Sequence, residues 1–199
     1  MFSKKEIKNM DTWKKEITVG NKKLQKKKVL QYYRNLWKKK SFRDIVRKKG
    51  VFVRASYGKP VIKRKNIKID TFNDMRKIIH EHGVEIISPV KNIGYKSAVD
   101  VDMPKRYLKG RKKNAWTVIR RLKESRVDVA EVTDSPRGVH IFSRSKKSDM
   151  RQALERIAKE DSRFHVGRSS KQKIVLDAGE SNMAIPGSLS IKGKPYKKW

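Results

Sequence analysis

The chain has 199 residues and carries 53 lysines and arginines against 20 aspartates and glutamates, a formal net charge of +33 at pH 7. That charge favours a polyanionic partner, and a nucleic acid suits it better than a membrane because the basic residues are spread along the whole chain. No run of about 18 apolar residues predicts a membrane span, and the N-terminus lacks the apolar core of a secretion signal.

The absence of cysteine excludes a disulfide framework and a thiolate zinc site. We therefore expect a cytoplasmic protein associated with the nucleoid, or a nuclear one if the source has a nucleus. Residues 1–22 predict a basic N-terminal arm. Residues 23–199 predict a single domain, large enough to bury a core of its periodic apolar segments.

Hydrophobic periodicity predicts the mixture of helices and strands of an α/β fold, and we expect its sheets to be antiparallel. Helices are expected over residues 24–40, 41–49, 71–83 and 114–126 and after residue 148, with Ser41, Ser148 and a Thr71–Asp74 pair at three of their starts. Strands are expected over residues 51–57, 61–69, 84–90, 97–103, 127–132, 139–142 and 174–177. In the first helix, Tyr32 and Tyr33 are expected in the core rather than on a base-stacking surface.

The stretch over residues 97–104 alternates apolar and acidic side chains with the period of a strand that has one buried face. Asp100 and Asp102 then lie on the same side, with their α-carbons about 7 Å apart. Two like charges at that distance repel unless a cation lies between them. Oxygen ligands without a nearby thiolate favour Mg²⁺ or Mn²⁺. A solvated strand end with two unrelated aspartates is the alternative reading of this short motif.

A second group of polar residues follows at 134–142. Ser135, Arg137 and Gly138 form a turn that presents a hydroxyl, a guanidinium and backbone N–H groups, which suits a phosphate. His140 alternates with Val139 and Ile141 and therefore points away from their face. It has either a structural role or a role in the same site.

A third carboxylate, Asp177, ends the apolar strand that begins at residue 174. Beside Asp100 and Asp102 it would complete a two-metal site for in-line phosphoryl or nucleotidyl transfer. The segment that follows, residues 185–194, is a turn-rich basic loop suited to phosphates and contains Ser188 and Lys192.

These residues resemble a known superfamily. The order Asp100-x-Asp102, Ser135-x-Arg137-Gly138-x-His140 and Asp177 is similar to the three motifs of the archaeo-eukaryotic primases. The tail over residues 186–189 resembles a segment of archaeal primase small subunits. The residues at 32–34 and 59–61 look like features of the polymerase domain of bacterial ligase D.

The resemblance implies a catalytic core with an RNA-recognition-like antiparallel sheet flanked by helices. It implies that Asp100, Asp102 and Asp177 hold two Mg²⁺ or Mn²⁺ ions, with no zinc. The incoming triphosphate would contact Ser135, Arg137, Gly138, His140, Ser188 and Lys192. The chain departs from the primase tail at Ser190, where that tail has a histidine.

The expected function is therefore that of a primase or primase-polymerase, which joins NTPs or dNTPs on a single-stranded or primer-template DNA. A larger primase, replication or repair complex is an expected further partner, and a membrane is not. The alternative from another class is a non-catalytic, basic nucleic-acid-binding protein with a degenerate primase fold. A nuclease using the same metals is a third possibility, against which the phosphate-binding turn argues.

Overall fold

The computed structural model describes residues 16–19, 22–48, 51–54, 69–82, 85–167, 170–178, 182–190 and 194–199. The predicted strand over residues 61–69, apart from its last residue, and most of the basic arm therefore lie outside the described residues. The helices are α2 (Lys26–Trp37), α3 (Lys40–Val46), α4 (Phe72–His82), α5 (Val90–Ile93), α6 (Arg111–Glu124) and α7 (Lys147–Glu160), with a 3₁₀ turn η1 (Lys105–Tyr107). No helix in the described part of the chain is long and apolar enough to cross a bilayer.

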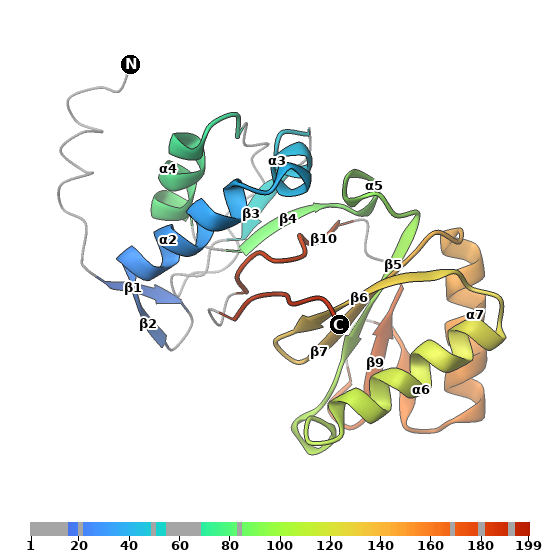
Figure 1. Ribbon diagram of the computed structural model, residues 1–199. Coiled ribbons are helices and arrows are strands. Elements are labelled where there is room, and N and C mark those ends of the chain that lie inside the picture. The colour runs from blue at the N-terminus through green and yellow to red at the C-terminus, as the bar shows by residue number, and fades with distance from the viewer. Residues whose placement is uncertain are drawn as a thin grey trace.

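The strands form three sheets. They are β1 (Glu16–Val19), β2 (Lys22–Gln25), β3 (Phe52–Arg54), β4 (Glu85–Pro89), β5 (Ser97–Asp102), β6 (Val129–Ser135), β7 (Gly138–Ser143), β8 (Phe164–Val166), β9 (Ile174–Asp177) and β10 (Asn182–Ala184). A five-stranded sheet has the order β6-β7-β5-β9-β8, a three-stranded sheet the order β10-β4-β3, and β1 pairs with β2. Figure 1 shows α6 and α7 beside the large sheet, with α2, α3 and α4 gathered around the smaller one.

The predicted α/β class is confirmed, but the expectation of purely antiparallel sheets is wrong at one pair. Strands β8 and β9 run parallel, so the five-stranded sheet is mixed. Strand β8 is only three residues long, too short for a period-two pattern to reveal it in the sequence.

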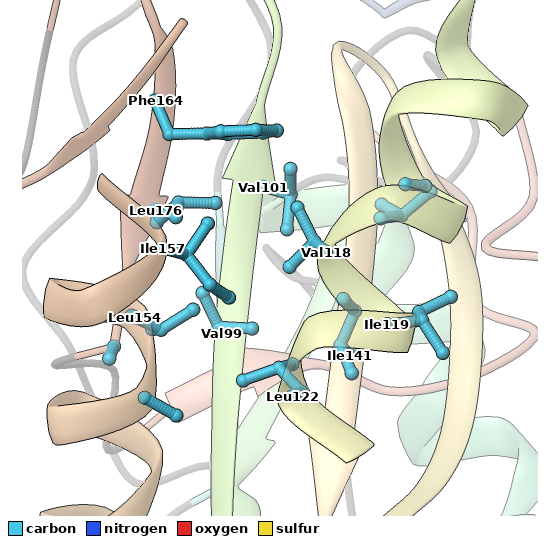
Figure 2. Packing of buried hydrophobic residues seen from close by; sticks show 14 of the residues in the cluster. Val99, Val101, Val118, Ile119, Leu122, Ile141, Leu154, Ile157, Phe164 and Leu176 are labelled. Atoms are coloured by element: carbon cyan, nitrogen blue, oxygen red, sulfur yellow. The ribbon is translucent and has the colours of Figure 1, made fainter. Parts of the chain in front are cut away.

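One face of the large sheet, here called the helix face, packs against α6 and α7. Strand residues Val99, Val101, Ile141 and Leu176 are fully buried there against helix residues that include Leu122. Figure 2 shows these side chains meeting between the sheet and the two helices. Burial of each such side chain stabilises the fold by roughly 2 kcal/mol relative to leaving it exposed.

That packing fixes the register of β5. A slip by one residue would turn Asp100 and Asp102 toward the helices and Val99 and Val101 away from them. Burying two carboxylates without partners costs far more than any gain in pairing. The aspartates are therefore held on the opposite face, here called the site face.

A second core lies around the smaller sheet and draws the C-terminal part of the chain onto the N-terminal helices. Tyr33 of α2 is fully buried, as predicted, and its hydroxyl accepts a hydrogen bond from the backbone N–H of Leu189 at 2.9 Å. The neighbouring Tyr32 donates to the carbonyl of Gly187 at 2.5 Å. Adjacent tyrosines thus anchor the turn over residues 186–189 from one helix.

Two of the three expected helix starts differ from the prediction. Helix α3 begins at Lys40 and α7 at Lys147, and neither has a side-chain cap from the predicted Ser41 or Ser148. The Thr71–Asp74 pair is confirmed, because the backbone N–H of each residue donates to the other's side chain. Ser148 has an arginine three positions later, so it lacks the acidic partner of a capping box. Ser41 does have Asp44 at that spacing, but the helix begins one residue before Ser41, so the serine is not at the N-cap.

Gly138 provides a direct test of the sheet. It lies opposite Asp102 in the β5–β7 pairing, and a Cβ added there would lie 1.7 Å from the carbonyl oxygen of Val101. We expect Gly138→Ala to lower the free energy of unfolding by about 3 kcal/mol, because backbone has to move to admit the methyl group. For a chain of this length, that lowers Tm by about 10 °C in a thermal melt.

The matched control is Gly110→Ala, where the added Cβ meets only ordinary contacts, 3.6 Å from Nδ2 of Asn114 and 3.9 Å from the carbonyl of Tyr107. Its Tm is expected within about 2 °C of wild type. Equal Tm values for the two variants would contradict the close approach of β7 to β5.

Candidate active site

Four polar side chains form a row across the site face of the large sheet. In the cross-strand pairing, Asp100 of β5 lies opposite His140 of β7 on one side and opposite Asp177 of β9 on the other. Thr133 of β6 lies opposite His140 in turn. Directly opposed residues place their Cβ atoms about 5 Å apart on the same face. The second and third sequence motifs are therefore brought beside the first.

His140 is held between an acid and an aromatic ring. Its Nε2 atom lies 3.5 Å from Oδ1 of Asp100, and its ring stacks on Tyr196 with centroids 5.1 Å apart and an angle of 21° between the planes. The His140 side chain is only 8% exposed. It faces away from the core between the sheet and helices α6 and α7, as its alternation with Val139 and Ile141 predicted.

Asp102 lies two residues further along β5, at the end of the site face. Its carboxylate forms an ion pair with Arg137, which occupies the two-residue turn between β6 and β7. Among the described residues, no three histidine, aspartate or glutamate side chains converge closely enough to hold a metal ion. The three aspartates thus share one face on adjacent strands, but Asp102 is paired with a guanidinium rather than gathered with the other two.

Ser135 lines a cavity of about 300 Å³ next to this row. The cavity walls also include Arg111, Lys194, Lys197 and Tyr196. The Ser135 hydroxyl is buried and has no hydrogen-bond partner among the described residues. Asp134 also lines the cavity and pairs with Arg111 at 3.2 Å. The three cationic side chains outnumber this one carboxylate, and together with the unsatisfied hydroxyl they suit an anion such as a phosphate.

The remaining predicted site residues have different surroundings. Gly138 has a role in strand pairing, because its missing side chain leaves room for the carbonyl oxygen of Val101. Ser188 is fully buried, and its hydroxyl donates to the carbonyl of Ile185 at 2.8 Å, so the prediction that it contacts a nucleotide is not supported by its position. The turn predicted for this basic loop is present, but the Ser188 side chain points into the protein interior. Lys192 lies outside the described residues.

A larger cavity, about 700 Å³, also has Tyr196 in its wall and is lined by Tyr32, Tyr95 and Glu131 among others. The Tyr95 hydroxyl donates to Oε2 of Glu131 at 2.6 Å, and Nζ of Lys198 lies 2.5 Å from the same oxygen. The pKa of Tyr95 is raised well above its ordinary value, mainly because the side chain is buried and to a smaller extent because its hydroxyl bonds to the Glu131 carboxylate. Tyr95 therefore remains a protonated hydrogen-bond donor at neutral pH.

Sequence reasoning missed Tyr196, whose ring covers His140 and lines both cavities. It belongs to a short basic stretch that includes Lys194 and Pro195, where no periodicity marks a buried aromatic residue. Its hydroxyl donates to Glu85, a carboxylate that is 2% exposed. The sequence signal was a charged residue at the start of the short, mostly apolar β4.

The five-stranded mixed sheet with a central Asp-x-Asp strand confirms the predicted likeness in fold to the polymerase domain of bacterial ligase D. The structure is similar to that of the polymerase domain from Mycobacterium tuberculosis ligase D in complex with DNA. The TM-score is 0.61 at 13% sequence identity, covering 88% of this chain and 80% of that chain. No protein-family model and no curated protein match the sequence.

The contact between Tyr196 and Glu85 is testable by substitution. We expect Tyr196→Phe to lower the free energy of unfolding by about 2 kcal/mol, because it removes a hydrogen bond to a buried charged group while keeping the ring that stacks on His140. Urea unfolding followed by circular dichroism measures the change.

The matched background is Glu85→Gln, in which the acceptor is neutral. There the loss of the hydroxyl is expected to cost about 1 kcal/mol, as for a hydrogen bond between neutral groups. An equal cost in both backgrounds would show that the hydroxyl does not stabilise the protein through the Glu85 carboxylate.

Proposed function

We propose that this chain is a template-directed nucleotidyltransferase of the primase-polymerase type. In this reaction a 3′-hydroxyl attacks the α-phosphate of an NTP or dNTP, and pyrophosphate leaves. The observation that carries the proposal is the register of Asp100, which has Asp177 and His140 directly beside it on its two neighbouring strands. The similarity in fold to a ligase D polymerase domain supports the same class.

In the proposed site, Asp100, Asp102 and Asp177 hold divalent ions. Their donor atoms are all carboxylate oxygens, the ligands that Mg²⁺ and Mn²⁺ prefer. When bound, such ions activate the attacking hydroxyl and neutralise charge on the triphosphate. The Asp100 and Asp102 side chains are 32% and 25% exposed, so solvent and ions reach both.

The triphosphate is assigned to the end of the β6–β7 hairpin. Ser135 offers its unpartnered hydroxyl, and the cavity beside it supplies the charges of Arg111, Lys194 and Lys197. The imidazole of His140 lies at the centre of the row, oriented by Tyr196 and Asp100. Each of these groups can donate a hydrogen bond or a positive charge to a phosphate oxygen.

Arg137 connects the two halves of the proposed site. It is bonded to Asp102, yet its side chain is 65% exposed, so the guanidinium can leave the carboxylate at little cost. When it leaves, Asp102 becomes available to join Asp100 and Asp177, and Arg137 becomes available to a phosphate. Entry of nucleotide and completion of the carboxylate set are then linked through one side chain.

The same ion pair favours a second candidate, a non-catalytic nucleic-acid-binding protein. With Asp102 neutralised by Arg137, and no three acidic or histidine side chains converging among the described residues, the site face would be a purely structural surface. Primer extension separates this candidate from the enzyme.

Primer extension on a single-stranded DNA template with Mn²⁺ tests the proposal directly. We expect the wild-type protein to add nucleotides and Asp100→Asn, Asp102→Asn and Asp177→Asn each to lose about a hundredfold or more in rate, because each removes a charge that holds the ions. The matched control is Asp128→Asn, an exposed aspartate paired with Arg144 away from this row. Equal incorporation by all five proteins, or none by wild type, would leave the binding protein as the better reading.

If Arg137 moves between Asp102 and a phosphate, then removing its side chain should weaken nucleotide binding and strengthen metal binding. Arg137→Ala is expected to raise KM for nucleotide, because a phosphate contact is lost. Its affinity for Mn²⁺ without nucleotide is expected to rise about fivefold, because Asp102 no longer has a competing cation and a partly exposed pair contributes up to ~1 kcal/mol. Electron paramagnetic resonance titration measures free Mn²⁺, and weaker Mn²⁺ binding by the variant would contradict the exchange.

A further inference from the structure

Two tryptophans form an exposed aromatic pair that the proposed site does not use. Three large apolar side chains are exposed among the described residues, and two of them are Trp116 at 56% and Trp199 at 40%. Their ring centroids are 6.1 Å apart. Trp116 lies on α6 and Trp199 on the C-terminal segment, so segments distant in the sequence build this pair, here called the tryptophan platform.

The position of Trp199 is fixed by several contacts. Its backbone N–H donates to the carbonyl of Val132 on β6 at 3.0 Å, and Lys198 forms a β-bridge with Thr133, so this segment extends the free edge of the sheet. The indole N–H of Trp199 donates to Oδ1 of Asp134 at 2.8 Å. The same oxygen lies 3.2 Å from the guanidinium of Arg111 on α6. The platform is therefore built into the fold.

Cationic side chains surround the platform. Lys112, Lys113 and Arg120 are exposed on α6 and lie three or four residues from Trp116, which places them on its face of the helix. Two acids lie nearby: Glu124, whose carboxylate pairs with Arg120 at 3.6 Å, and Asp134, which accepts from the Trp199 indole and pairs with Arg111. The two lysines and two arginines outnumber these two carboxylates, so the surface around the rings is positively charged.

We propose that the tryptophan platform binds the bases of a single-stranded nucleic acid while Lys112, Lys113 and Arg120 bind its phosphates. Aromatic side chains stack on unpaired bases of any sequence, and flanking cations track the backbone. A duplex offers its bases only at its ends, so the platform selects single strands. The positive charge around the rings complements a polyanion.

The platform also adjoins the proposed site. Arg111 and Asp134, which hold Trp199, line the cavity of about 300 Å³ that contains Ser135. A strand stacked on Trp116 and Trp199 is therefore guided toward the end of the β6–β7 hairpin. Its assignment as a template rests on the proposed function, whereas the binding itself does not.

The test measures binding in EDTA without nucleotide, by fluorescence anisotropy of labelled oligo(dT), oligo(U) and a DNA hairpin duplex. We expect Trp116→Ala to bind the single strands about tenfold more weakly and the duplex as wild type, whereas Trp116→Phe retains most of the affinity.

The salt dependence of binding tests the phosphate contacts. Lys112→Gln is expected to lower the slope of the logarithm of the binding constant against the logarithm of salt concentration by about 0.7. The matched control Lys159→Gln, on the exposed side of α7, is expected to leave it unchanged. The oligo(dT) and oligo(U) arms distinguish DNA from RNA as the strand.

Equal binding of both single strands by Trp116→Ala and wild type would overturn the proposal, as would equal losses on single strand and duplex. A wild-type dimer that Trp116→Ala converts to a monomer in sedimentation, with oligonucleotide binding unchanged, would assign the platform to a second copy and also overturn it. Asp100→Asn separates the two proposals, because its oligonucleotide binding should equal that of wild type whether or not the chain is a polymerase.

Discussion

Strand β5 is hydrogen-bonded on both sides and faces two different environments, and the rest of the molecule is arranged around that constraint. Its valines are fully buried against α6 and α7, whereas Asp100 and Asp102 lie on the opposite face. Because β7 and β9 pair with it in fixed register, the residues opposite Asp100 must be His140 and Asp177. A hydrophobic core on one face therefore determines which polar side chains meet on the other.

The C-terminal segment completes that polar face. Its first turn is anchored to α2 through Tyr32 and Tyr33. Further along, Tyr196 covers His140, and Trp199 bonds to Asp134 on β6. These contacts draw the smaller sheet and its helices toward the large sheet, and they form walls of the two cavities. A variant that loosens this segment would alter the environment of His140 without touching an aspartate.

Much of this arrangement could be predicted from the sequence where one local pattern decides the structure. The alternation around Asp100 predicted that this residue lies on a strand and which face of the strand it occupies. The Thr71–Asp74 pair predicted the start of a helix. Residues 135–138 predicted the hairpin turn. The row of Asp100, His140 and Asp177 followed from motif order and a resemblance, because no single stretch specifies which strands become neighbours.

The features that could not be predicted depend on contacts between distant residues. The Arg137–Asp102 ion pair and the stacking of Tyr196 on His140 arise from tertiary packing, which leaves no period in the sequence. Ser188 illustrates the same limit, because a basic, turn-rich sequence does not specify whether its hydroxyl faces a phosphate or, as in the structure, the carbonyl of Ile185. Local composition indicates that a loop is basic, but packing decides where each side chain points.

An anomalous difference map from crystals grown with Mn²⁺ and a non-hydrolysable nucleoside triphosphate tests directly whether the three aspartates hold the ions. We expect Mn²⁺ peaks between Asp100, Asp102 and Asp177, with Arg137 turned from Asp102 to the triphosphate beside Ser135 and His140. Mn²⁺ bound elsewhere, or a triphosphate away from the β6–β7 hairpin while Arg137 stays on Asp102, would contradict this expectation.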